Sequence, residues 1–129
     1  MQIVGHGIDL VEVARIEKML ADHGAHFEQR VFTSAEIAYA SGRPKRRAEH
    51  LAARFAMKEA VLKALGTGWR GGIRWTDVEV QSDALGKPTV ALAGEAAELA
   101  RARGATAWMV SISHAGGFAM ASAIASGAP

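Results

Sequence analysis

Four charged side chains in this sequence occupy positions where charge is costly to bury. Asp9 lies within the apolar segment "QIVGHGIDL", and Lys58, Glu59 and Lys63 lie within "ARFAMKEAVLKAL", residues 53–65. A buried carboxylate or ammonium is tolerated only when it is paired, hydrogen-bonded or bound to an ion of opposite charge. These residues therefore indicate either buried ion pairs or a site for a charged ligand.

The chemistry that two carboxylates and two lysines could perform is phosphate chemistry assisted by a hard cation. Mg²⁺ commonly binds one or two carboxylates, with waters and substrate phosphates completing its octahedron. Asp9 and Glu59 would supply the carboxylates, and the lysines would contact the phosphates. A plainer alternative stays open, in which the lysine stems extend to water and Glu59 joins a buried ion pair. A Glu59–Lys63 pair would by itself contribute only about 0.2–0.5 kcal/mol if exposed.

Two elements must position these side chains. Alternation in residues 2–10 predicts a strand in which Asp9 shares a face with Gly5 and Gly7, so we expect that face to leave room for a ligand. Residues 48–65 predict a long helix that the following "GTG" ends. A strand end and a helix would thus bring the two acids together.

The remaining segments predict further helices and hairpins. A helix that begins near Val13 should end at Gly24, and Thr33 with Glu36 forms a capping box that starts a second helix, so Glu36 is a cap rather than a catalyst. Alternation in "DVEVQS" and "KPTVALA" predicts a hairpin, "GEAAELARARG" a short helix, and "AWMVSISH" with "FAMASAIA" a second hairpin. We therefore expect a single compact α+β domain over residues 1–129, with an antiparallel sheet packed against helices.

Composition limits the class of protein. The chain has 129 residues, of which 50% are hydrophobic and 22% charged, as in a globular domain with a substantial core. It contains no cysteine, so neither disulfides nor thiolate zinc sites are available, and no apolar run approaches the roughly 18 residues of a membrane span. We expect a soluble cytoplasmic protein without a targeting segment or membrane contact.

Basic residues gather in "RPKRR", residues 43–47, although the formal net charge is only +2. This cluster predicts either a docking place for an anion or a solvated loop.

Two other motifs resemble known functional signatures but lie in the wrong structural context. "GTGWRG" follows a helix rather than a strand, which argues against a dinucleotide-binding loop and favours a helix stop with a phosphate-approach loop. Ser113 and His114 of "SISH" point to opposite faces of a strand, which argues against a serine–histidine catalytic pair.

Taken together and in this order, "GIDLVEVARI", "FTSAE", "ARFAMKEAVLKALGTG", "DVEV", "GKP" and "SISH" closely resemble the holo-acyl-carrier-protein synthases, the small bacterial 4′-phosphopantetheinyl transferases. The most specific element is G-I-D near the start combined with F-x-x-K-E-A-x-x-K-A in the later helix. The resemblance spans nearly the whole chain. It implies the 4′-phosphopantetheinyl transferase fold, and a homotrimer whose active site lies between neighbouring subunits.

The activity implied by the resemblance is magnesium-dependent transfer of the phosphopantetheine arm of coenzyme A to a serine of acyl carrier protein, with release of adenosine 3′,5′-bisphosphate, in fatty acid biosynthesis. Asp9 and Glu59 match the family's metal carboxylates, and Glu59 is our candidate general base, directly or through a water on the metal. Lys63 matches the lysine that contacts the phosphates and assists the leaving group. Lys58 matches the family's other lysine in this helix, for which phosphate contact and structural pairing are both open.

The resemblance also assigns contacts with the coenzyme and the carrier protein. The contacts for the 3′-phosphate are Arg46 and Arg54 together with Lys45, and those on the adenine side are Pro88 and His114. Gly66 opens the phosphate-approach loop. Arg15 and Met19, on one exposed flank of the first helix, match the surface that receives the acidic recognition helix of acyl carrier protein.

Two positions depart from the family's pattern. Ala115 follows His114 where many relatives carry an acid, so no carboxylate is supplied there for catalysis or for orienting the histidine. His6 stands where an apolar residue is common, and we interpret it as structural.

Two other functions compete with this interpretation. A small basic nucleic-acid-binding domain would use "RPKRR" as its contact, and its affinity would fall steeply with salt and need no magnesium. A magnesium-dependent phosphoryl-transfer enzyme with another nucleotide substrate would keep the metal and the phosphate contacts. The resemblance favours coenzyme A and acyl carrier protein over both, with no nucleic-acid partner.

Overall fold

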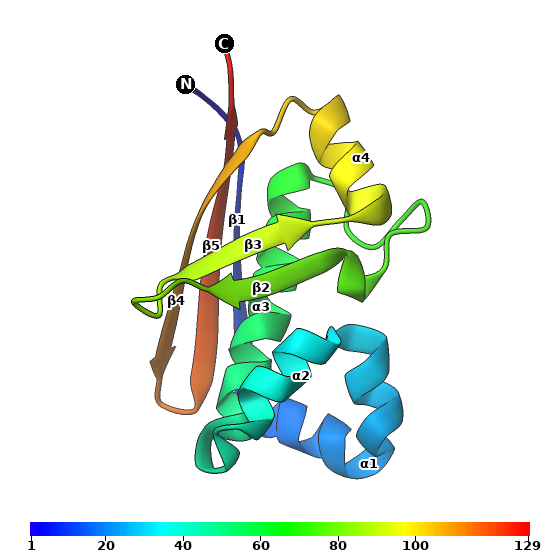
Figure 1. The fold of residues 1–129 in the computed structure, drawn as a ribbon, viewed down its shortest axis with the longest axis vertical. Coiled ribbons are helices and arrows are strands. Elements are labelled where there is room, and N and C mark those ends of the chain that lie inside the picture. Colours follow the sequence, from blue (N-terminus) through cyan, green and yellow to red (C-terminus); the bar gives the residue numbers. More distant parts are fainter.

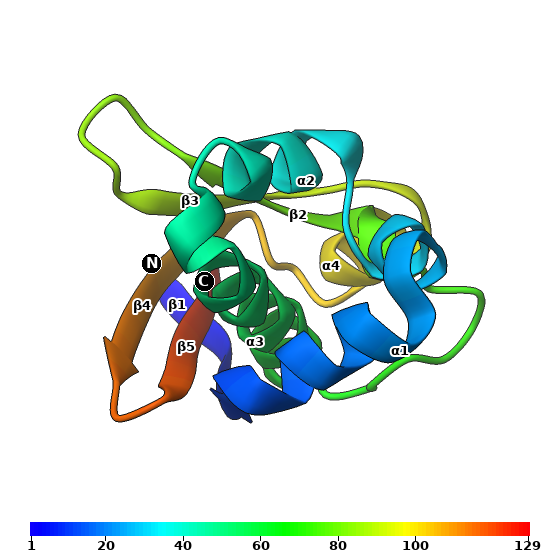
Figure 2. The same ribbon diagram turned by 90° about the horizontal axis from the view of Figure 1, so that it is seen from below.

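A long buried helix organises this fold. In the computed structural model, which describes residues 1–129, helix α3 (Arg47–Leu65) passes between the other elements, and most of its side chains are buried. Figures 1 and 2 show three strands on one side of α3 and the remaining helices and a hairpin on the others. The other elements are, in chain order, β1 (Gln2–Glu12), α1 (Val13–Val31), α2 (Ser34–Ser41), a 3₁₀ turn (Pro44–Arg46), a second 3₁₀ turn (Trp75–Asp77), β2 (Val78–Ser82), β3 (Pro88–Leu92), α4 (Gly94–Ala102), β4 (Ala107–Ala115) and β5 (Phe118–Gly127).

The strands form two sheets rather than the single sheet that the sequence predicted. One is three-stranded and antiparallel in the order β1-β5-β4, and the other is the β2–β3 hairpin alone. The hairpin lies beside β4 without joining its hydrogen-bond ladder, and its strand β2 is hydrogen-bonded to the helices. Glu36 of α2 accepts a hydrogen bond from the backbone N–H of Val80, and Lys58 of α3 donates to the carbonyl of Val78. Alternation predicted the strands correctly but not which of them pair.

The glycines of β1 serve helix packing, not ligand binding. A Cβ atom on Gly5 would lie 1.9 Å from the carbonyl oxygen of Ala64, and one on Gly7 would lie 1.9 Å from that of Ala60. The expectation that this face is open for a ligand is therefore wrong, because the backbone of α3 fills it. Close approach has a useful consequence, since it places Asp9, two residues beyond Gly7, beside the same helix.

The helix ends follow the predicted signals, with one exception. The hydroxyl of Thr33 accepts from the N–H of Glu36 at 3.2 Å, and the Glu36 carboxylate accepts from the N–H of Thr33 at 2.8 Å, which completes the capping box of α2. Gly66 ends α3 in the left-handed conformation with φ of 82°. Gly24, which was expected to end α1, instead kinks it at φ 53° and ψ −131°, and the helix resumes and continues to Val31.

The three-stranded sheet presents one face to α3 and one to solvent. Alanines 119, 121, 123 and 125 of β5 are buried against the helix and belong to a single core of 25 residues. The opposite face, here called the outer face, carries large apolar side chains that remain exposed. These are Ile8, Leu10, Met109, Phe118 and Met120. None of the helices combines the length and apolar character that crossing a bilayer requires.

Candidate active site

The two acids that are remote in the sequence lie near each other beside one lysine. The ammonium of Lys63 contacts a carboxylate oxygen of Asp9 at 3.1 Å and donates to the carbonyl of Ile8 at 3.0 Å. Glu59 lies one turn earlier on α3, and the negative charge of Asp9 acts on its carboxyl group. The structure therefore brings Asp9, Glu59 and Lys63 together as predicted, although Lys63 pairs with Asp9 rather than with Glu59.

The surroundings of Glu59 favour its neutral form. Burial raises the pKa of Glu59 above its ordinary value, and the neighbouring charge of Asp9 raises it further. The indole of Trp69 and the charges of Lys63 and Arg15 lower this pKa in turn. The indole N–H of Trp69 is buried and makes no hydrogen bond of normal geometry. A cation bound here would relieve the repulsion between the two carboxylates.

The donor set fits Mg²⁺ with most of its ligands supplied from outside the chain. The chain has no cluster of three or more His, Cys, Asp or Glu side chains arranged to hold an ion. Two carboxylates on neighbouring elements are nevertheless the usual protein share of a magnesium site that binds a phosphorylated substrate. Asp9 and Glu59 are both partly exposed, so water and phosphate oxygens can reach them. The residues present therefore fit the ion.

Lys58 belongs to the core and not to this site. Its side chain is fully buried, and its ammonium contacts Glu36 at 2.8 Å, the carbonyl of Trp75 at 3.1 Å and the carbonyl of Val78. All three of its donors are thus occupied. Burial lowers the pKa of Lys58, and the charge of Glu36 opposes that shift. Of the two roles left open, structural pairing is the one that the structure supports, and the assignment of Lys58 as a coenzyme contact is corrected.

A second group of predicted residues lines a pocket on the other side of α3. Arg54, Pro88 and His114 border a cavity of about 200 Å³ together with Tyr39 and the backbone of Gly86. Arg54 is only 4% exposed, and its guanidinium lies over the ring of Tyr39 at 4.1 Å. Its Nε is buried without a hydrogen-bond partner, and burial lowers its pKa. An anionic group entering this cavity would meet an unsatisfied donor.

The other predicted contacts lie outside that cavity. Lys45 and Arg46 are exposed on the 3₁₀ turn before α3, and Arg46 donates to Glu49 at 2.6 Å. Gly66 lies at the opposite end of α3, three residues after Lys63, so it belongs with the carboxylates rather than with Arg54. The predicted site thus falls into two halves, the carboxylate half and the pocket half, which are separated by α3 within one chain.

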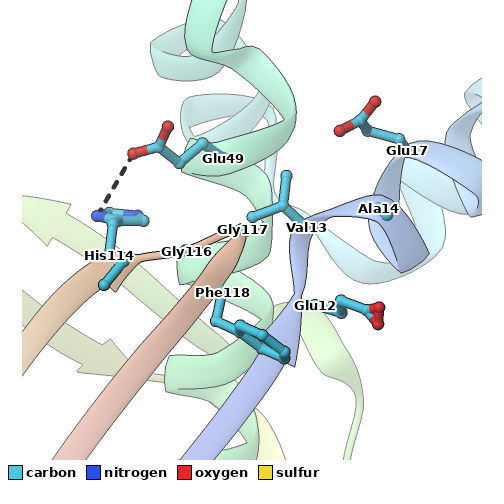
Figure 3. Close-up of a pocket in the computed structure, with 10 residues that line it drawn as sticks. Glu12, Val13, Ala14, Glu17, Glu49, His114, Gly116, Gly117 and Phe118 are labelled. Carbon is cyan, nitrogen blue, oxygen red and sulfur yellow. Dashed lines mark ion pairs between the residues drawn. The ribbon is translucent and has the colours of Figure 1, made fainter.

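His114 connects the pocket half with a larger hollow next to it. Figure 3 shows the side chains that line this hollow, which lies between the start of α1, the β4–β5 turn and α3. Its volume is about 580 Å³. His114 Nδ1 lies 3.7 Å from a carboxylate oxygen of Glu49. Sequence reasoning did not select Glu49, Tyr39 or Trp69. Only Glu49 carried a signal, since it lies three residues after Arg46 at the spacing of a helical ion pair.

The flank of α1 that was predicted to meet a partner also lines a hollow. Arg15 is exposed and its guanidinium lies 5.7 Å from the ring centre of Phe55, while Met19 is half-buried. Both border a cavity of about 450 Å³ with an apolar floor and a basic rim. The rest of its lining is His23, His26, Phe27, Arg30, Val31, Phe55 and Trp75. No acid lines this hollow, so it suits an acidic partner that also carries apolar side chains.

Comparison with known proteins shows which family shares this small α+β fold. Residues 5–121 match the family model of the 4′-phosphopantetheinyl transferase superfamily. A holo-[acyl-carrier-protein] synthase of Geobacter sp. (strain M21) is 50% identical over 119 residues, which are 92% of this chain and 94% of that protein. Among solved structures, the synthase of Neisseria meningitidis superposes with a TM-score of 0.86 at 33% identity, covering 96% of this chain and 98% of that one.

A further solved structure carries a ligand. The synthase of Helicobacter pylori, in complex with coenzyme A, superposes with a TM-score of 0.82 at 30% identity, over 94% of this chain and 99% of that one. The fold and the extent of these matches define a 4′-phosphopantetheinyl transferase. Within that superfamily, the chain belongs to the holo-[acyl-carrier-protein] synthases.

Proposed function

We propose that this protein transfers the 4′-phosphopantetheine arm of coenzyme A to a serine of apo acyl carrier protein and releases adenosine 3′,5′-bisphosphate. The observation that carries the proposal is the convergence of Asp9, Glu59 and Lys63, because this group can hold a diphosphate through both a cation and an ammonium. The relatives named above are synthases of this kind, and one of them holds coenzyme A. Residues 1–129 act as one transferase domain.

Transfer needs one phosphorus–oxygen bond to form and one to break. The serine oxygen of the carrier protein attacks the phosphorus that bears the pantetheine arm, and the bridging oxygen leaves with the adenosine bisphosphate. Glu59 is the base that accepts the serine proton. Lys63 faces the developing charge on the leaving phosphate. The nucleophile comes from the carrier, so this chain needs none of its own.

Asp9 and Glu59 would hold Mg²⁺. When bound, the ion neutralises charge on the diphosphate as the leaving group departs. The nucleotide end would occupy the pocket half, with Arg54, Arg46 and Lys45 on the 3′-phosphate and Pro88 and His114 on the adenine side. Gly66 lies beside the carboxylate half, where a backbone without a Cβ lets phosphate approach.

The two halves lie on opposite sides of α3, so we propose that a homotrimer joins the carboxylate half of one subunit to the pocket half of its neighbour. The exposed apolar side chains of the outer face support assembly through this sheet. Leu10→Glu should convert trimers into single chains, which light scattering after size exclusion would measure. The same substitution should abolish transfer of the phosphopantetheine arm. Leu85→Glu is the matched control, because Leu85 is 95% exposed but lies in the β2–β3 turn. Trimers of Leu10→Glu would contradict this interface.

The carrier protein should dock on α1. Arg15→Glu places a negative charge at the basic rim, so KM for apo carrier protein should rise about tenfold or more while KM for coenzyme A stays within about twofold. Lys18→Glu is the control, because Lys18 lies on the same helix but pairs with Asp22 outside the hollow. Equal effects of the two substitutions on KM for the carrier would show that only net charge matters.

The activity itself is tested by intact mass spectrometry. Purified protein, apo acyl carrier protein, coenzyme A and magnesium should convert the carrier to a species heavier by one phosphopantetheine group, and chelation of the metal should stop the conversion. A carrier that keeps its apo mass under these conditions would refute the proposed function. We place this reaction in the cytoplasm and in fatty acid biosynthesis.

A further inference from the structure

Glu49 lies where two predicted coenzyme contacts meet. One of its carboxylate oxygens accepts a hydrogen bond from Arg46 at 2.6 Å and lies 3.7 Å from His114 Nδ1. The hydrogen bond from Arg46 lowers the pKa of Glu49, and the charge of Arg46 lowers it further against the effect of burial. Glu49 therefore stays ionised and attracts both groups. It belongs to the first turn of α3, where the helix dipole also favours an acid.

His114 has one ring nitrogen facing this carboxylate and one without a partner. The 3.7 Å contact is an electrostatic one, longer than a hydrogen bond. It favours a proton on Nδ1, which leaves Nε2 as the acceptor of the neutral ring. Nε2 is buried and has no hydrogen-bond partner in the chain. A buried acceptor in that state is costly to leave unpaired, and a ligand that donates a hydrogen bond would satisfy it.

Other carboxylates near His114 lack this arrangement. Glu12 and Glu17 line the same hollow, but Figure 3 shows them across it from His114, and neither forms an ion pair. Ala115, the next residue along β4, supplies no acid. Glu49 is therefore the carboxylate that contacts the histidine.

We propose that Glu49 is a positioning residue for the nucleotide end of coenzyme A, which holds His114 and Arg46 in the orientations that bind adenosine 3′,5′-bisphosphate. This inference rests on the proposed function, because it assumes that His114 and Arg46 meet the nucleotide. It opposes a simpler view, in which Glu49 merely neutralises Arg46 and so competes with phosphate. The two views predict opposite effects when the charge is removed.

Binding of adenosine 3′,5′-bisphosphate by isothermal titration calorimetry separates these views. Glu49→Gln should weaken binding about tenfold, since His114 and Arg46 lose their common anchor. Glu17→Gln removes a charge from the same hollow without touching His114, and its Kd should match wild type. Unchanged or tighter binding by Glu49→Gln would overturn the inference, because removal of a mere competitor strengthens phosphate binding. Wild-type protein that binds no nucleotide would refute the coenzyme site itself and this inference with it.

Two further measurements exclude a general structural effect. Nitrogen NMR of histidine-labelled protein should show the Nδ1-protonated form of His114 enriched in wild type and depleted in Glu49→Gln, with no nucleotide present. Glu49→Gln should also add little to the loss caused by His114→Ala, because the two residues act together. Identical His114 signals in wild type and Glu49→Gln, or fully additive losses, would each overturn the role.

Discussion

Glu59→Gln should lower kcat for phosphopantetheine transfer by about 10³-fold or more, and Asp9→Asn should do the same. Each amide keeps the shape of the side chain but removes the negative charge that holds the cation, and Glu59→Gln also removes the base. The measurement is kcat at saturating coenzyme A, carrier protein and magnesium. Glu98→Gln is the control, because Glu98 is exposed on α4 and pairs only with Arg101. Activity of either site variant within tenfold of wild type would contradict the assignment.

The loss of activity in Glu59→Gln should not come from a loss of stability. Burial and the charge of Asp9 raise the pKa of Glu59 in the folded chain. An acid with a raised pKa binds its proton more tightly when folded, so above that pKa its charge favours unfolding, and this penalty disappears as the pH falls below the ordinary pKa of glutamate. Without metal at neutral pH, Glu59→Gln should therefore melt at or above the Tm of wild type. A lower Tm would contradict the described environment of Glu59.

The largest effect on stability should come from Lys58→Met, which should lower the free energy of unfolding by about 3–5 kcal/mol. This substitution leaves the buried carboxylate of Glu36 without its cation, and it leaves the carbonyls of Trp75 and Val78 without a donor. Denaturant unfolding followed by circular dichroism measures the change. The double variant Glu36→Gln/Lys58→Met should lose less than the sum of the single losses, because the two charges are coupled.

Lys63→Met is the matched control, with the same change made in the same helix. Lys63 is 54% exposed in its pair with Asp9, so its loss should reduce stability by less than about 1 kcal/mol while strongly reducing transfer. The two substitutions should therefore have different effects, with Lys58→Met lowering stability and Lys63→Met lowering activity. A Lys58→Met protein with wild-type Tm and no activity would contradict the structural role of Lys58 and indicate that it contacts phosphate.

Local signals in the sequence predicted the elements well, because they act within a few residues. Thr33 and Glu36 marked the start of α2, and Gly66 marked the end of α3, since each supplies its own hydrogen bond or backbone conformation. Gly24 shows the limit of such signals. A glycine permits a break in a helix, but the packing of Phe27 and Val31 in the core lets the helix resume beyond it.

Long-range partners were harder to predict. Glu36 was identified as a cap, yet its bond to Lys58, 22 residues further on, depends on how α2 crosses α3. Gly5 and Gly7 were interpreted as space for a ligand, and in the structure that space holds the backbone of α3. Lys58 and Lys63 occupy similar positions in the same sequence motif. They point in different directions from α3, so Lys58 lies in the core and Lys63 lies in the candidate site.

The sequence predicted that Asp9 and Glu59 lie close together, but not how the other candidate residues are arranged around α3. The motif pairing Asp9 with Glu59 placed both acids on elements that do meet, because β1 packs directly on α3. The helical spacing of Arg54 and Glu59 separates their directions around α3, but nothing in the sequence indicated that His114 joins Arg54 in one pocket. The role of Glu49 could not be predicted from the sequence either, because its contact with His114 joins two elements that are far apart in the chain, α3 and β4.

The most direct test of the site is the binding of Mn²⁺, which takes the same oxygen ligands as Mg²⁺ and is visible by electron paramagnetic resonance. Wild-type protein with coenzyme A should bind a single Mn²⁺ per chain, and Asp9→Asn and Glu59→Gln should each weaken that binding more than about tenfold. Wild-type affinity for Mn²⁺ in both variants would place the ion elsewhere and contradict the account of these two acids.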